Sequence, residues 1–210
     1  MNYLKKFESF QTHDEIHKIC KQYNINNYTI NSDGSIDVDG DVNLHFKMLK
    51  RLPLKFNHVS GDFWCSINFL TTLEGAPQSV SGNFLCYNNK LTTLEGAPKY
   101  VRGNFKCSYN KLTTLEGAPQ SVGGVFGCNS NKELKSLYYL PQYIDGIVSF
   151  RDTSVYEIFK LFGDYSSSMI RYVNDFKVVK DDKIDLELLN ALLYDYGKPP
   201  VENVKGYDNI

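Results

Sequence analysis

Four cysteines recur at one fixed spacing in the sequence. Cys65, Cys86, Cys107 and Cys128 are 21 residues apart, and an apolar phenylalanine lies two residues before each of them. In a stacked repeat, equal spacing places such thiols in a column, where a soft metal ion could bind. Metal sites usually bring paired Cys-x-x-Cys or Cys/His spacing, which this sequence lacks. We therefore expect free thiols packed as small apolar groups, with no metal and no cofactor.

A second group of residues invites a calcium interpretation. Four carboxylates gather in one short stretch: Asp33, Asp37, Asp39 and Asp41. Calcium prefers several oxygen ligands, but a calcium loop of the EF-hand kind has an order ending in Glu that is absent here. The pair Asp33-Gly34 is instead a strong hairpin signal between the β-prone segments 28–30 and 36–38. The sequence thus predicts a solvated hairpin edge, with calcium as the alternative.

Catalytic patterns are weak in this chain. The four histidines have no recognisable spacing to a Ser, Cys or carboxylate partner: they are His13, His17, His45 and His58. A Gly-rich phosphate loop and a His-Glu-x-x-His motif are also missing. We therefore predict that the protein is not an enzyme.

The elements that position these residues come from an internal repeat. The segments GDFWCSINFLTTLEGAPQSVS, GNFLCYNNKLTTLEGAPKYVR and GNFKCSYNKLTTLEGAPQSVG are nearly the same, and each is 21 residues long. We call each such copy a rung. A fixed period of this length is the signature of a solenoid, in which each repeat touches only its neighbours. Degenerate copies begin at Gly40, Gly124 and Gly146, so we expect about six rungs.

Within a rung, the alternation of residue types predicts a strand with one buried side. Phe105 and Cys107 alternate with polar neighbours and should point inward. Asn110 recurs in every full copy, and an inward amide at that position can satisfy backbone groups along the stack. Leu112 and Leu115 then add a second wall of the core, and Gly-Ala-Pro turns the corner. The rung is too short to include an α-helix.

This pattern resembles a leucine-rich repeat, with Phe105, Cys107, Asn110, Leu112 and Leu115 at its consensus positions. The resemblance covers residues 40 to about 158 and implies a parallel β-sheet on a concave face. One departure is an extra residue before each phenylalanine, next to a glycine such as Gly103, where we expect a β-bulge.

The sequence as a whole predicts an α+β solenoid with helical caps at both ends. Residues 1–39 form an N-terminal helical cap and β-hairpin, residues 40–158 the leucine-rich repeat solenoid, and residues 159–210 a C-terminal helical cap and tail. In the N-terminal cap, residues 1–10 read as one amphipathic helix, and Thr12 with Glu15 begins a second. The polar tail after Pro200 is expected to lie on the surface or to fray.

A narrower resemblance rests on the phrase L-T-T-L-E-G-A-P and on V-x-G-x-F-x-C-x-x-N. Both are similar to sequences of small, uncharacterised leucine-rich repeat proteins encoded by tailed bacteriophages. The resemblance implies a viral origin and an interaction role, and it supplies no active site. The opening MNYLKKFESF also resembles tags that direct phage proteins into the capsid. A virion or assembly component is therefore the alternative to a binding module that docks a host or phage protein and blocks a host function.

The implied binding surface is the outward side of the concave strands. The residues flanking the inward cysteine are the predicted contacts: Asn43, His45, Trp64, Ser66, Leu85, Tyr87, Lys106, Ser108, Asn129 and Arg151. Trp64, Leu85 and Tyr87 would place exposed apolar area on neighbouring rungs, which favours a protein partner. The formal net charge of -1 and the isolated Lys106 and Arg151 argue against nucleic acid. A secretion signal and a membrane-spanning run are absent from the sequence, so we expect no membrane association and a cytoplasmic location.

Overall fold

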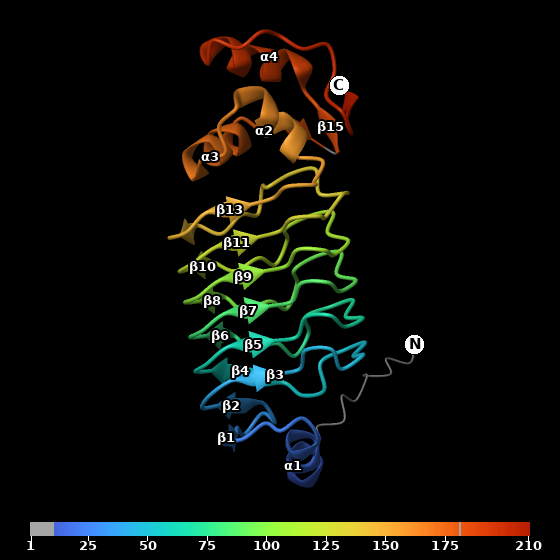
Figure 1. Cartoon of the computed structure of the whole chain (residues 1–210), viewed down its shortest axis with the longest axis vertical. Helices are drawn as coiled ribbons and strands as arrows, with labels where there is room; N and C mark the ends of the chain where they lie inside the picture. Colours follow the sequence, from blue (N-terminus) through green and yellow to red (C-terminus); the bar gives the residue numbers. More distant parts are fainter. Residues whose placement is uncertain (1–10, 181) are drawn as a thin grey trace, which may run out of the picture.

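A computed structural model describes residues 11–180 and 182–210 of the chain. Residues 1–10, the predicted amphipathic helix or capsid tag, lie outside this part. In the described part, short strands are stacked along one long axis, with helix α1 (His13–Gln22) at one end and the other three helices at the opposite end (Figure 1). No helix among the described residues combines the length and the apolar character needed to cross a membrane.

Six of the strands form a parallel sheet, which we call the phenylalanine sheet. Its strands are β3 (Val42–Asn43), β5 (Phe63–Trp64), β7 (Phe84–Leu85), β9 (Phe105–Lys106), β11 (Phe126–Gly127) and β13 (Val148–Ser149). Neighbouring strands pair one repeat apart, so Phe63 lies beside Phe84 and Phe84 beside Phe105. The inward phenyl rings stack with centroids 5.3 to 5.4 Å apart. The predicted parallel strands with buried phenylalanines are therefore present.

The prediction of a single parallel sheet is incomplete, because a second sheet of seven strands lies beside the first. We call it the valine sheet. Its strands are β1 (Tyr28–Ile30), β2 (Ile36–Val38), β4 (Phe56–Val59), β6 (Ser79–Val80), β8 (Tyr100–Val101), β10 (Ser121–Val122) and β12 (Tyr143–Ile144). Strands β1 and β2 form the predicted antiparallel hairpin, and the sheet is parallel from β2 to β12.

The two sheets meet at a corner built from glycines, and this corrects the expected β-bulge. The amide of Gly103 donates to the carbonyl of Gly82 over 2.9 Å, and Gly82 donates in the same way to Gly61 over 3.0 Å. A Cβ atom at Gly103 would lie 2.7 Å from the Gly82 carbonyl oxygen, closer than real Cβ contacts. The extra residue therefore turns the chain from the valine sheet into the phenylalanine sheet, and glycine is needed because the backbones approach so closely.

Two ladders of polar side chains tie successive rungs together. The buried amide of Asn89 donates to the carbonyls of Cys65 and Cys86 over 3.0 and 3.1 Å and accepts from the amide of Leu70 over 3.0 Å. Asn68, Asn110 and Asn131 repeat this pattern. The predicted structural role of these asparagines is confirmed, since they satisfy backbone groups where the chain leaves the sheet.

The second ladder lies at the glycine corner, and the sequence pattern does not predict it. The Asp62 carboxylate accepts from the Asn83 amide over 2.6 Å, and Asn83 Oδ1 in turn accepts from the Asn104 amide over 2.9 Å. The residue before the inward phenylalanine thus faces along the stack in three rungs, where the side chain of Asp62, Asn83 or Asn104 caps the next rung.

The ends of the stack are covered as expected, with one correction. Thr12 and Glu15 form the predicted capping box of α1, which buries Ile16 and Cys20. At the other end lie α2 (Tyr156–Phe162), α3 (Ser167–Asp175) and α4 (Leu186–Asp195), where a C-terminal helical cap is predicted, and α2 begins three residues before the predicted boundary at residue 159.

The correction concerns the tail. A small third sheet joins β14 (Val179–Lys180), β15 (Lys183–Ile184) and β16 (Asp208–Asn209). Tail residue Val204 is buried, and the Tyr207 hydroxyl donates to the carbonyl of Lys135 over 2.5 Å. The tail is therefore anchored by a parallel strand pair and a buried tyrosine, which the polar composition of residues 201–210 does not reveal.

Candidate interaction surface

The strands of the phenylalanine sheet determine where the ten predicted contact residues lie. The residue after each inward phenylalanine faces outward, and the strand register aligns Asn43, Trp64, Leu85 and Lys106 in one column. The residue after each inward cysteine or its equivalent continues a second column: His45, Ser66, Tyr87, Ser108, Asn129 and Arg151. The sheet therefore brings side chains from sequence positions more than 100 residues apart onto one face.

The exposure of these side chains is uneven. Asn43, Lys106 and Arg151 are exposed, whereas Trp64, Leu85 and Tyr87 are half-buried. His45, Ser108 and Asn129 are half-buried as well. The apolar members thus keep part of their surface accessible and bury the rest. An accessible aromatic side chain whose base is already held in place is typical of interface anchors.

Ser66 is the exception among the predicted contacts, because only 1% of it is exposed. Its hydroxyl forms a 2.9 Å hydrogen bond with Nδ1 of His45, the equivalent residue one rung earlier. The expectation that Ser66 is free to touch a partner is therefore not met in this structure. The cause is the neighbouring imidazole, which takes the hydroxyl as its hydrogen-bonding partner.

Asn129 also has an internal role. Its side-chain oxygen accepts hydrogen bonds from the Ser149 hydroxyl over 2.9 Å and from the Arg151 amide over 2.7 Å. The side chain therefore fixes the last strand of the phenylalanine sheet and the turn after it. Arg151, whose backbone it holds, keeps an exposed side chain.

On the first two rungs, three exposed apolar residues beside this face are missing from the predicted contacts. Phe46 is 70% exposed, Met48 is 74% exposed and Phe69 is 44% exposed. They follow the strands β3 and β5 at the turn where each rung leaves the sheet. Their positions could have been found in the sequence. Each of the three lies two or four residues after an inward residue and next to the asparagine position. Together with Trp64, Leu85 and Tyr87 they concentrate accessible apolar area on the first three rungs.

Two Ser–His pairs are also missed, and both have the spacing of one rung. Nδ1 of His58 lies 2.8 Å from the Ser79 hydroxyl, in the same way as His45 and Ser66. A nucleophile–base pair needs a third group that orients the imidazole. Among the described residues, the hydrogen bonds of His45 and His58 include no acceptor for the second ring nitrogen. We therefore interpret both pairs as contacts between stacked rungs.

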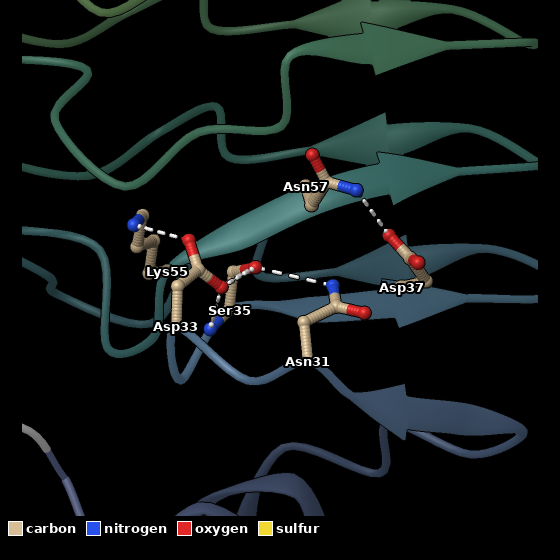
Figure 2. Close-up of polar contacts among 6 residues, drawn as sticks. All are labelled: Asn31, Asp33, Ser35, Asp37, Lys55 and Asn57. Carbon is tan, nitrogen blue, oxygen red and sulfur yellow. Dashed lines mark hydrogen bonds and ion pairs between the residues drawn. The ribbon is translucent and has the colours of Figure 1, made fainter.

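The aspartate cluster is occupied by donors of the protein itself. The Asp33 carboxylate accepts from Lys55 over 2.7 Å and from the Ser35 amide over 3.0 Å, while Asp37 accepts from Asn57 over 2.7 Å; Figure 2 shows these contacts. The Lys55 and Ser35 hydrogen bonds hold the pKa of Asp33 well below its usual value. These carboxylates fasten the hairpin to the next rung, which fits the predicted hairpin edge. In the part of the chain that the structure describes, no three His, Cys, Asp or Glu side chains gather as a metal site.

The cysteine column is part of the core. Cys65, Cys86, Cys107 and Cys128 are fully buried and unpaired, as predicted for packed thiols. Burial raises the pKa of Cys128 to about 12, and it raises the pKa values of the other three thiols as well. Because the thiolate is the nucleophile, these buried, protonated thiols are poorly suited to nucleophilic attack.

Comparisons of the chain with family models, with curated proteins and with solved structures found no match. Function therefore has to be inferred from the residues of this chain. Its most distinctive surface is the outward face of the phenylalanine sheet, where aromatic and aliphatic side chains of the first rungs give way to Lys106 and Arg151.

Proposed function

We propose that the chain is a leucine-rich repeat solenoid that binds a protein and carries out no catalysis. In this proposal the outward face of the phenylalanine sheet is the concave side of the solenoid. Pairing of its strands one repeat apart and the buried asparagine ladder support the assignment. The partner is a host or phage protein in the cytoplasm, and occupation of its surface blocks its function.

The observation that carries the proposal is the group of three apolar side chains on adjacent strands. Trp64 and Leu85 are direct neighbours in the parallel ladder, and Tyr87 lies two residues beyond Leu85. All three are half-buried. Anchors of binding interfaces are enriched in Trp and Tyr and lie in such partly preformed surroundings. The polar and charged rim supplied by Asn43, Lys106 and Arg151 suits the edge of a protein interface.

The test begins with affinity purification from infected cells and continues as a binding titration with the captured protein. Trp64→Ala and Tyr87→Ala should each weaken binding by about 1 kcal/mol or more, which is roughly fivefold in the dissociation constant. Trp64 is the only tryptophan of the chain, so its fluorescence should change when the wild-type protein binds.

Matched controls lie on the other sheet. Tyr100 and Tyr143 are 54% and 70% exposed on the valine sheet, so Tyr100→Ala and Tyr143→Ala should leave binding unchanged. Melting temperatures of all four variants establish that they are folded. Full affinity in the Trp64 and Tyr87 variants, or a loss confined to the Tyr100 and Tyr143 variants, would overturn this site.

A further inference from the structure

Each rung has a third side. It is formed by the segment that connects the strand in the phenylalanine sheet to the strand in the valine sheet. In the rung from Phe84 to Asn104, Leu91 and Leu94 point into the core and are fully buried. Lys90, Thr92 and Glu95 are exposed on the outside of the same extended segment. We call this surface, and its equivalents in the neighbouring rungs, the threonine side. Figure 1 shows these connecting segments stacked one above another between the two sheets.

The threonine side carries two columns of like charge. One column consists of Lys90, Lys111 and Lys132, and the other of Glu74, Glu95 and Glu116, all exposed. Backbone hydrogen bonds hold both columns in register, from the Lys111 amide to the Leu91 carbonyl over 2.9 Å and from the Leu94 amide to the Glu116 carbonyl over 2.8 Å. Threonine hydroxyls fix the turn at the glutamate column. The hydroxyls of Thr72 and Thr114 accept from the backbone amides of Glu74 and Glu116 over 3.1 Å.

Neither column is neutralised within the described chain. The ion pairs among residues 11–180 and 182–210 join Lys55 to Asp33, Lys160 to Glu157 and Lys180 to Asp185, so none includes a member of either column. Lys90 lies over the ring of Phe69 at 4.9 Å from its centroid, which still leaves it without a carboxylate. Like charges on directly opposed strands are unfavourable, and strands stack about 4.8 Å apart. Within the described residues, therefore, no member of either column has an ion-pair partner.

We propose that the partner of both columns is the threonine side of a second copy of this chain, which goes beyond the proposed binding of another protein by the phenylalanine sheet. A half-turn about an axis parallel to the stack keeps every rung at its own level and exchanges the two columns. Lys90 then faces Glu95 of the second copy, and Lys111 faces Glu116. The same two pairs form again by symmetry. Thr92 and Thr113, which lie between the columns, are small enough to let the two copies approach closely.

This symmetry is selected by the charges. A two-fold axis lying across the stack would place lysine against lysine and glutamate against glutamate. An extended anionic ligand, such as a single-stranded nucleic acid, would match the lysine column but would meet the neighbouring glutamates. Only a surface with both charges at the rung spacing satisfies both columns. The contact is small and polar, and interfaces below about 1,200 Å² in total are typical of weak association.

Sedimentation velocity over a concentration series tests the proposal. The wild-type protein should associate reversibly at low salt and dissociate as salt is raised, because screening weakens exposed ion pairs. K111E and E116K should each raise the dissociation constant of the dimer about tenfold or more. In an equimolar mixture of the two variants, each substituted position faces its opposite charge, so heterodimers should form with restored affinity. K99E changes an exposed lysine next to β8 and is the matched control.

Three results would overturn the dimer. These are a wild-type protein that stays monomeric at low salt up to its solubility limit, a dimer that K111E and E116K leave intact, and a mixture that associates no better than either variant alone. Binding of an oligonucleotide that K111E abolishes, by a protein that remains monomeric, would assign the lysine column to an anionic ligand instead. The Trp64 and Tyr87 variants leave this assay unchanged, so the two proposals can fail separately.

Discussion

One residue in each rung lies in the left-handed region of backbone space, although only two of these residues, Asn88 and Asp152, are of a type suited to it. Two residues after the inward cysteine or its equivalent, φ is between 53° and 56° in Phe46, Ile67, Asn88, Tyr109, Ser130 and Asp152. This backbone geometry lets the chain leave the phenylalanine sheet while each amide still bonds to the next rung, as Tyr109 does to the carbonyl of Asn129 over 2.9 Å. Asparagine tolerates such a conformation far better than tyrosine or isoleucine.

When one of these residues is replaced by its equivalent from another rung, the direction of the change in the free energy of unfolding can therefore be predicted. Tyr109→Asn should raise the free energy of unfolding by about 0.5 to 1 kcal/mol, because the left-handed penalty is relieved and the 63% exposed ring contributes little burial. The reverse change, Asn88→Tyr, should lower it by a similar amount. Urea denaturation of both variants measures the two values. A destabilised Tyr109→Asn protein would mean that the ring packs more tightly than its exposure indicates.

At the scale of the strand, local pattern predicts the phenylalanine sheet but only the hairpin β1–β2 of the valine sheet. Phe105 and Cys107 alternate with polar residues, so their strand is visible in the sequence. The two-residue strands β6, β8 and β10 of the valine sheet contain a single buried residue each, such as Val101, which gives no period to detect. They form because stacking at a 21-residue spacing supplies their hydrogen-bonding partners. The same reasoning explains the tail strand β16, whose partner β15 lies more than 20 residues earlier.

The predicted contact residues divide in the same way. The register of the strands follows from the repeat, so the columns that contain Trp64, Leu85 and Lys106 could be predicted. Burial of Ser66 could not, because it depends on the rotamer of His45 one rung away. Exposure of Phe46 and Met48 depends on the left-handed turn, which composition does not reveal.

A substitution at the glycine corner tests how closely the backbones pack there. Gly103→Ala should lower the free energy of unfolding by about 1 to 3 kcal/mol, because its Cβ atom would be forced against the Gly82 carbonyl 2.7 Å away and the two backbones would have to separate. Gly127→Ala is the matched control on strand β11, where the nearest atoms to an added Cβ are 3.7 Å away. That variant should be as stable as the wild type. Equal unfolding free energies for the two variants in urea would contradict a close-packed corner.

At the scale of the molecule, the proposed solenoid is held together by similar contacts that repeat between neighbouring rungs. The contact of Phe63 with Phe84 repeats that of Phe84 with Phe105, at centroid distances of 5.3 and 5.4 Å. The asparagine ladder likewise repeats its donors and acceptors from Asn89 to Asn110. In such an architecture each repeat interacts with the next one only. The number of rungs can then change without loss of the fold, provided that whole rungs are removed.

Deletion of residues 84–104 tests this directly. The deletion joins Asn83 to Phe105 and preserves the Gly-Asn-Phe sequence, so Phe63 can stack on Phe105 and Asn83 can accept from the amide of Val125 in place of Asn104. The shortened protein should keep the shape of its circular dichroism spectrum and lose about 1 to 3 kcal/mol of unfolding free energy, in proportion to the 21 residues removed. Deletion of residues 84–93 alone removes Phe84, Cys86 and Leu91 but leaves the second half of the rung, so no neighbour can stack in register and the protein should fail to fold cooperatively. If both deletions unfold the chain to the same extent, its stability resides in contacts beyond nearest neighbours and the solenoid assignment is wrong.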